Sequence, residues 1–193
     1  MYILPVSGFT MIEETEAEGE TAELFEALKQ AMGFPFVPNM DKAIGIAPNL
    51  IKVHMAFMGA MHEHLTLPES LYSIISYCIS TAKNCTYCSV NHELYCRTLG
   101  VDEEMLNKLA QDLGNVNPVR LRAIIEFAVK CAVDPQRLVA EDYDQVRAQG
   151  VSEEELLEII FIAAAANFAD TLADGLKIEV ETMVMHALGR NGH

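Results

Sequence analysis

The sequence predicts an all-α fold. Apolar residues recur at the three- and four-residue spacing of amphipathic helices, and no segment alternates apolar and polar residues as a half-buried strand does. The chain has 193 residues, 51% of them hydrophobic, which is enough to bury one substantial core. No linker indicates a domain boundary, so we expect one helical domain over residues 1–193.

The helices are predicted in chain order from these apolar patterns. Residues 1–15 are expected to form an irregular lead-in, and a helix over 18–32 ends at Gly33. The prolines in 34–39 exclude a helix there. The expected helices that follow begin and end at about 41–45, 48–64, 66–83, 85–100, 102–112, 117–133, 141–150, 152 to beyond 163, and 178–188.

Two of these helix starts carry the capping-box pattern, Thr66 with Glu69 and Ser152 with Glu155. The helix after Ser152 is apolar on nearly all sides, so we expect it at the centre of the molecule or at a subunit interface. Both capping boxes precede an apolar run, small residues and a further helix, which is a weak sign of a degenerate internal repeat.

Charge and cysteine content restrict the class of protein. The formal charge of −15, from 13 basic and 28 acidic residues, argues against nucleic acid or an anionic membrane as a partner. The N-terminus has no basic leader, and no run of about twenty apolar residues is free of polar interruption, so we expect no signal peptide and no membrane span. Five cysteines do not form a secreted disulfide framework. We therefore expect a cytoplasmic protein.

The segment 84–92 carries the chemistry. At helical spacing, Cys85, Cys88 and His92 lie on one face, because residues three and four apart are neighbours. A thiolate is the reactive form of cysteine, and a helix N-terminus favours it. His92 can take the proton of Cys88, and Cys85 is near enough to capture an oxidised Cys88 as a disulfide. The expected cycle is thiolate attack, a sulfenic acid or mixed disulfide, then closure of the 85–88 disulfide.

Two other interpretations of these residues remain. Structural zinc uses cysteine and histidine, but it needs four ligands, and no second closely spaced pair follows His92. Alternatively, both cysteines are small buried apolar groups. We predict neither a metal nor a cofactor. Cys78, Cys96 and Cys131 are interpreted as structural, although Cys78 can also face the same cavity, and His54 is interpreted as a buried, hydrogen-bonded histidine in preference to a cavity residue.

The motif Cys85-x-x-Cys88-x-x-x-His92, preceded by a helix that starts at Leu67-Pro68, resembles the AhpD-like alkylhydroperoxidases of the carboxymuconolactone decarboxylase superfamily. Further similarity to the peroxidase-related branch covers about 17–178, at Gly33-Phe34, Val37-Pro38-Asn39, Ala47-Pro48, Phe127-Ala128, Asp134-Pro135, 150–154 and Asn167-Phe168. The resemblance implies an AhpD-like helical bundle, assembly into dimers, trimers or hexamers, and peroxide reduction. Cys88 is then the attacking thiol, Cys85 the resolving thiol and His92 the proton relay.

One position departs from that family pattern. The family has a glutamate twelve residues before the first cysteine, where this chain has Ser73, and a serine cannot carry the negative charge. Glu69 lies one turn earlier, but its capping-box role already accounts for it. Ser73, Glu69 and Tyr87 are therefore accessory candidates only.

The function that the sequence favours is a thiol-dependent antioxidant enzyme that reduces hydroperoxides or partner disulfides. Its reductant is expected to be a protein or small thiol. One alternative is a carboxymuconolactone decarboxylase-like enzyme, which shares the fold without the need for a cysteine pair. The other is a non-catalytic redox-sensing oligomer, which the serine at position 73 would permit.

Overall fold

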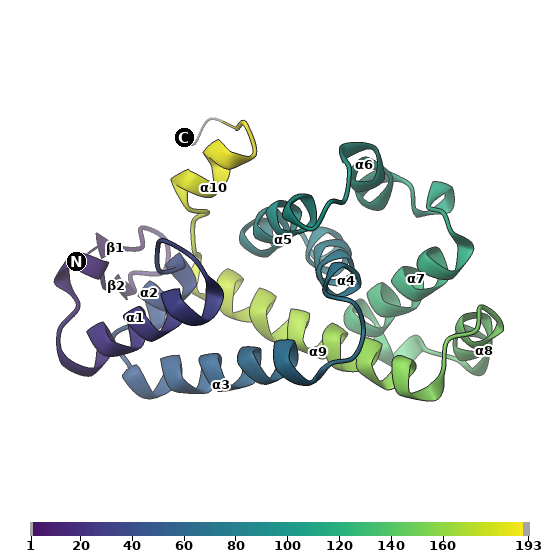
Figure 1. Ribbon diagram of the computed structural model, residues 1–193, viewed down its shortest axis with the longest axis horizontal. Coiled ribbons are helices and arrows are strands. Elements are labelled where there is room, and N and C mark those ends of the chain that lie inside the picture. Colours follow the sequence, from purple (N-terminus) through teal and green to yellow (C-terminus); the bar gives the residue numbers. More distant parts are fainter. Residues whose placement is uncertain (1, 191–193) are drawn as a thin grey trace.

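The computed structural model describes residues 2–190, and helices dominate that part of the chain (Figure 1). The predicted all-α class is confirmed, while the outermost residues of the expected domain, 1 and 191–193, lie outside the described part. The elements are β1 (Tyr2–Ile3), β2 (Thr10–Met11), α1 (Gly19–Met32), α2 (Asn39–Ile44), α3 (Pro48–His64), α4 (Glu69–Ala82), α5 (Thr86–Thr98), α6 (Glu103–Gln111), α7 (Val119–Val133), α8 (Ala140–Ala148), α9 (Glu153–Leu176) and α10 (Thr182–Ala187), with short 3-10 turns at Glu14–Glu16, Leu113–Asn115 and Pro135–Arg137.

The lead-in is more ordered than expected. β1 and β2 form a small antiparallel hairpin in which Tyr2 pairs with Met11 and Ile3 with Thr10. Strands of two residues are too short to show an alternating pattern, so the sequence could not reveal them. The prediction of an irregular segment over 1–15 is therefore wrong for these residues.

α9 is the central helix, as its nearly uniform apolar composition predicted. It packs against α4, α5 and α7 (Figure 1). The largest core cluster joins Ile75 and Ile79 of α4, Ile124 of α7, and Ile159 and Ile162 of α9, and all five are buried. By length and composition α9 is also the one described helix apolar enough to cross a membrane, with 44% of its apolar window buried. A core helix meets the same criteria, and the packing of α9 accounts for its composition.

The two predicted capping boxes have different outcomes. At α9 the box forms, because the Glu155 amide donates to Ser152 Oγ at 3.1 Å and the Ser152 amide donates to Glu155 Oε2 at 2.8 Å. At α4 it does not form. The helix begins after Pro68 without a side-chain cap, and Thr66 instead donates its amide and its hydroxyl to the Glu158 carboxylate of α9. Thr66 therefore attaches the α4 start to α9, and Glu69 is left exposed.

The turn between α4 and α5 positions the predicted site. Asn84 has a φ of 60°, a left-handed conformation that asparagine tolerates better than most residues. The Cys85 amide then donates to the Ser80 carbonyl at 2.9 Å, which holds the start of α5 against the end of α4. α5 therefore begins beside a helix whose residues Tyr72 to Ser80 are all buried.

Candidate active site

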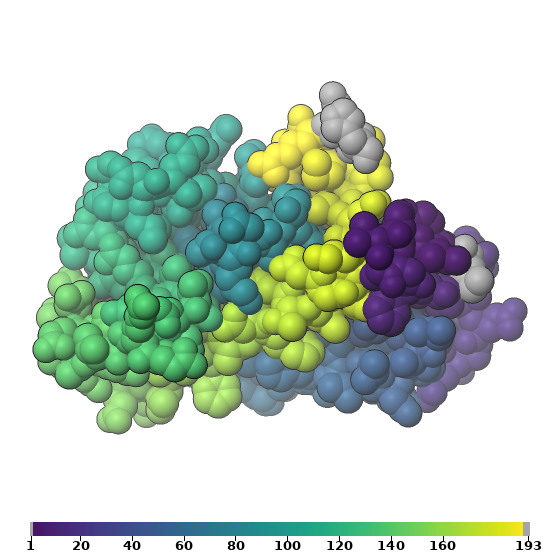
Figure 2. Space-filling model, turned by 180° about the vertical axis from the view of Figure 1, so that it is seen from behind, coloured from purple at the N-terminus to yellow at the C-terminus, as the bar shows by residue number. Residues whose placement is uncertain are grey.

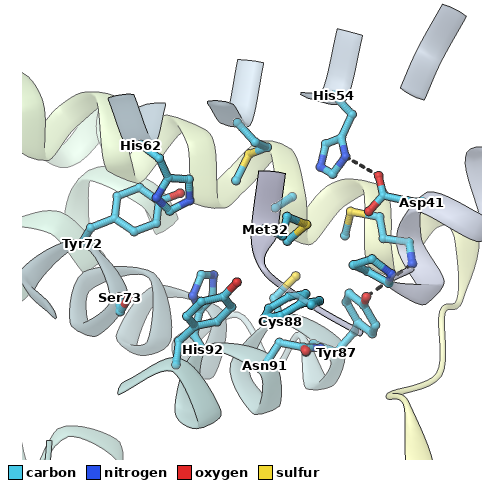
Figure 3. A pocket seen from close by; sticks show the side chains of 16 residues that line it. Met32, Asp41, His54, His62, Tyr72, Ser73, Tyr87, Cys88, Asn91 and His92 are labelled. Atoms are coloured by element: carbon cyan, nitrogen blue, oxygen red, sulfur yellow. Dashed lines mark hydrogen bonds and ion pairs between the residues drawn. The ribbon is translucent and has the colours of Figure 1, made fainter. Parts of the chain in front are cut away.

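A cavity of about 130 Å³ lies beside the N-terminal half of α5 (Figure 3). Much of its wall is apolar and comes from the α1 end, the following loop, α3 and α4. Its apolar and aromatic lining includes Met32, Phe34, Met40, Met58, Tyr72 and Tyr95. Its polar lining consists of Asp41, His54, His62, Ser73, Tyr87, Cys88, Asn91 and His92.

Of the two predicted redox cysteines, one lines the cavity and the other lies behind the cavity wall. Cys85 is the N-cap residue of α5, and Cys88 lies in the first helical turn. Cys88 lines the cavity, whereas Cys85 is fully buried and does not. Both thiols are free, and Sγ of each lies within 4.8 Å of the other and of a carboxylate oxygen of Asp170. The structure therefore brings the pair together and gives only Cys88 a route to a substrate.

The resting state of Cys88 differs from the expected thiolate. A hydrogen bond with Cys85, burial, and the negative charges of Cys85 and Asp170 together raise the pKa of the Cys88 thiol far above its usual range. The direction of this shift opposes the thiolate that the helix start and His92 were expected to favour, so the reaction of Cys88 requires a base.

His92 is placed where such a base is needed. It lies one turn after Cys88 and lines the same cavity. Burial lowers its pKa to about 4, although the charge of Asp170 acts in the opposite direction, so the ring is neutral near pH 7. Its Nδ1 is buried and has no hydrogen-bond partner among the described residues. His92 is thus a neutral imidazole with an unoccupied nitrogen.

Asp170 is a site residue that the sequence analysis did not find. It lies on α9 and is fully buried behind the cysteine pair. Ser80 Oγ donates to its Oδ1 at 2.7 Å, and Lys83 Nζ lies 3.3 Å from its Oδ2. An acidic residue on the buried side of a mostly apolar helix, three residues before the buried Ala173 and four after the buried Ala166, was the available signal. Asp170 supplies a carboxylate close to the pair, although it comes from a different helix than the family glutamate.

The three accessory candidates have different surroundings. Ser73 is buried and lines the cavity, but it is a hydroxyl where the family has a carboxylate. Glu69 is exposed and does not line this cavity, in agreement with the expectation that it does not replace the missing glutamate. Tyr87 lines the cavity and donates its hydroxyl to Glu181 Oε1 at 2.8 Å, which connects α5 to the segment before α10.

The other cysteines lie away from this cavity. Cys78 and Cys96 are buried together in a separate cluster, and Cys131 is partly buried beside the main core. Burial raises the pKa of Cys96 to about 12, which makes it a poor nucleophile. The structural interpretation of these cysteines agrees with their positions, and Cys78 does not face the cavity.

The ligand types near the pair also bear on the zinc alternative. Cys85, Cys88 and Asp170 form one group of three metal-binding side chains. A closed structural zinc site requires four ligands, and within the described residues this group has no fourth. The absence of a metal therefore stays a prediction, with Asp170 as a third ligand that the sequence did not indicate.

The structure gives His54 both of the roles that the sequence analysis considered for it. Its Nδ1 lies 2.7 Å from Oδ1 of Asp41, so the prediction of a hydrogen-bonded histidine holds. The ring also lines the cavity (Figure 3), which the sequence analysis considered the less favoured alternative. The structure thus places a histidine and aspartate pair on the cavity wall contributed by α2 and α3.

Comparison with known proteins shows which solved structures this fold resembles. No family model matches the chain, and no curated protein matches it. An uncharacterized peroxidase-related protein from Ralstonia eutropha JMP134, described as an alkylhydroperoxidase AhpD core, is 21% identical and has a TM-score of 0.80 over 94% of this chain and 95% of that chain. A peroxidase-related protein from Silicibacter sp. TM1040 is 20% identical, with a TM-score of 0.77 over 87% and 88%.

A third solved structure carries a different activity in its name. It is a cysteine-to-alanine variant of the debrominase Bmp8 in complex with 2,3,4-tribromopyrrole, 20% identical, with a TM-score of 0.78 over 94% of this chain and 95% of that chain. At these identities the likenesses establish the fold and leave the reaction open. The chain has the AhpD-like helical fold, as its cysteine motif predicted.

Proposed function

We propose that this protein is a thiol-dependent peroxidase that reduces hydroperoxides through Cys88 and Cys85. The observation that carries the proposal is the division between the two sulfurs, since Cys88 lines the cavity and Cys85 is sealed behind it. An attacking thiol needs access to substrate, whereas a resolving thiol needs access only to its partner. The peroxidase-related names of two similar structures agree with this reaction class.

The reaction has two steps. The Cys88 thiol loses its proton, and the sulfur attacks the distal oxygen of ROOH, so that an S–O bond forms while the O–O bond breaks. The products are a sulfenic acid at Cys88 and ROH. The thiol of Cys85 then displaces water from the sulfenic acid, which forms the disulfide. An external dithiol or two thiols, from a protein or a small molecule, restore the reduced pair.

The raised pKa of Cys88 assigns a role to His92 in the first step. A protonated thiol reacts slowly, so a base has to accept its proton as the S–O bond forms. His92 is neutral, lines the same cavity and has an unoccupied Nδ1. The carboxylate of Asp170 stabilises the imidazolium that results, because its charge raises the pKa of His92. We propose His92 as the proton relay, with Asp170 as its charged support.

Peroxide consumption in the presence of dithiothreitol tests this function. The parent protein should consume cumene hydroperoxide with turnover, and Cys88→Ser should consume none above background. Cys85→Ser should still oxidise Cys88 but form no intramolecular disulfide, so its turnover should depend on direct reduction of the sulfenic acid by dithiothreitol. Cys131→Ser is the matched control, because Cys131 lies beside the main core and away from the cavity. Equal rates for Cys88→Ser and the parent would refute the proposal.

A second candidate function is reductive dehalogenation of a small aromatic compound. The likeness to the debrominase covers nearly the whole chain, and the cavity wall contains several aromatic and thioether side chains. The discriminating assay is bromide release from 2,3,4-tribromopyrrole in the presence of dithiothreitol. Release that depends on Cys88, without peroxide consumption, would favour this candidate.

The two alternatives from the sequence predict other results. The decarboxylase alternative predicts lactone decarboxylation that survives alkylation of the thiols. The redox-sensor alternative predicts oxidation of the cysteine pair without turnover.

We also propose that the protein is a homo-oligomer in the cytoplasm. The helices α3 and α9 lie side by side on the face shown in Figure 2, and both carry exposed apolar residues. Leu50, Val53, Leu157 and Phe161 are each more than half exposed, and such patches are typical of protein interfaces. A reducing compartment would regenerate the cysteine pair. Light scattering after size exclusion should give a dimer, trimer or hexamer, and a monomer at micromolar concentration would contradict the assembly.

A further inference from the structure

The cavity holds a histidine and carboxylate pair that the proposed reaction has not yet used. Asp41, on α2, is 1% exposed, and its Oδ1 lies 2.7 Å from Nδ1 of His54 on α3. Figure 3 shows both side chains on the side of the cavity opposite the α5 residues Cys88 and His92, with His54 pointing inward. The pair therefore faces the reactive sulfur across the space that a substrate would occupy.

The hydrogen bond to Asp41 fixes how the imidazole of His54 is presented. Its Nδ1 is occupied by the carboxylate, so Nε2 is the nitrogen left for a ligand, and no described residue forms a hydrogen bond with it. A buried carboxylate is costly unless a partner compensates its charge. Phe168 lies against the ring, with 6.3 Å between the ring centroids, and limits its movement.

The other two histidines of the cavity have no carboxylate hydrogen-bonded to the ring among the described residues. His92 has no hydrogen-bond partner at Nδ1, and its pKa of about 4 makes its protonated form unfavourable at rest. His62 is exposed at the cavity edge, and no carboxylate pairs with it among the described residues. Among the described residues, His54 is therefore the one cavity histidine that a carboxylate holds in place across the cavity from Cys88, with Nε2 left for a proton transfer to a bound substrate.

We propose that His54, held by Asp41, is the general acid that protonates the leaving oxygen of the hydroperoxide. This inference rests on the proposed peroxidase function and adds a second catalytic residue, with Asp41 as its positioning residue. As Cys88 attacks the distal oxygen, both electrons of the O–O bond pass to the other oxygen, which takes the proton from Nε2 of His54 and leaves as ROH. The proton accepted by His92 from the Cys88 thiol restores His54, so the sum is thiol plus ROOH to sulfenic acid plus ROH.

The importance of His54 should depend on the leaving group. An alkoxide is a poor leaving group, so a general acid matters most when R is an alkyl or arylalkyl group. The cavity wall presents Met32, Phe34 and Met58 to such a group. The reaction of alkyl and arylalkyl hydroperoxides should therefore depend on His54 more than that of peracids, whose carboxylate leaves without protonation.

Leaving-group dependence provides the experiment. The rate of Cys88 oxidation is measured in single turnover with tert-butyl hydroperoxide and with peracetic acid. For His54→Gln we expect the first rate to fall by about 100-fold or more, and the second by less than about 3-fold, since general acids contribute about 100- to 10,000-fold only where the leaving group needs a proton. Asp41→Asn should give the same imbalance to a smaller extent. His64→Gln, which alters an exposed histidine of α3 that does not line the cavity, should change neither rate.

The outcomes separate the two proposals. If the parent Cys88 reacts with neither oxidant faster than free cysteine does, the peroxidase function itself fails. If the parent reacts but His54→Gln slows both oxidants equally, or neither, only the general-acid role fails. A second measurement needs no variant: the parent rates across substituted arylalkyl hydroperoxides should depend only weakly on the acidity of the leaving alcohol. A steep dependence would overturn the assignment even if the variants do not fold.

Discussion

The carboxylate of Asp170 lies within 4.8 Å of the sulfur of Cys88, and its charge opposes ionisation of that thiol. The resting pair is consequently protonated at the sulfur that faces the cavity. Asp170 has the opposite effect on His92, whose protonated form it stabilises. One buried charge thus adds to the raised pKa of the thiol and supports the imidazole that has to take its proton.

Removing Cys85 should make Cys88 more acidic. The hydrogen bond with Cys85 is the largest cause of the raised pKa, and the charge of Cys85 adds to it. In Cys85→Ala, the pH dependence of Cys88 alkylation by iodoacetamide should shift to lower pH than in the parent. Cys78→Ala, which removes a buried thiol outside the pair, should leave the profile in place. An unchanged profile in Cys85→Ala would show that the pair is not coupled.

Lys83 should contribute measurably to stability through its ion pair with the buried Asp170, 3.3 Å away. In Lys83→Met, the carboxylate keeps Ser80 but loses its cation, and we expect a loss of about 2 kcal/mol in the free energy of unfolding. Urea unfolding measures it. Lys52→Met is the matched control, since Lys52 and Glu20 form an exposed pair worth about 0–1 kcal/mol. Equal effects of the two substitutions would contradict a special role for the buried pair.

His92 should make the protein less stable in mild acid. Its pKa is lowered from 6.5 to about 4, so the folded state holds the neutral ring while the unfolded chain takes up a proton. The corresponding stability is complete above about pH 6.5 and is lost as the pH falls toward 4, by at most about 3 kcal/mol. Urea unfolding at pH 7.5 and pH 4.5 should show a smaller difference for His92→Gln than for the parent. The same difference in both proteins would mean that His92 titrates normally.

Glu158 should stabilise the start of α4 more than Glu69 does. Burial opposes its ionisation, but hydrogen bonds from Thr66 and Leu67 lower the pKa of Glu158 overall. Glu158→Gln weakens three of these bonds, which join α9 to α4, and should cost about 1–2 kcal/mol at pH 7. Glu69→Gln should cost little, because the expected capping box is absent. A larger loss of unfolding free energy for Glu69→Gln than for Glu158→Gln would indicate that the Thr66–Glu69 capping box forms.

Most of the helix starts and ends that were predicted correctly follow from local signals in the sequence. Gly33 ends α1, Asp102 accepts from the Met105 amide at the start of α6, and the Ser152 box starts α9, each within a few residues of the pattern that predicted it. The Thr66 box failed because a carboxylate from a distant helix competes for the same donors. Capping patterns record what neighbours in sequence can do, and tertiary contacts decide whether they do it.

The same distinction applies to the site. Cys85, Cys88 and His92 share one short segment, so their proximity could be predicted. Asp170 and Asp41 reach the site from α9 and α2, and nothing in the local pattern connects them with α5. Both are acidic residues in apolar surroundings, which marks them as exceptional without identifying their partners. The raised pKa of Cys88 follows from the hydrogen bond with Cys85, from burial and from the charge of Asp170, and the last two could not be read from the local pattern that favoured a thiolate.

The identity of the first sulfur to be oxidised tests the central claim most directly. The Cys85→Ala and Cys88→Ala proteins are each treated with one equivalent of cumene hydroperoxide in the presence of dimedone, which traps sulfenic acids, and the adduct is located by mass spectrometry. The account predicts an adduct on Cys88 in the first protein and none on Cys85 in the second, because Cys88 alone of the pair lines the cavity. An adduct on Cys85 in the second protein, with Cys88 unmodified in the first, would contradict it.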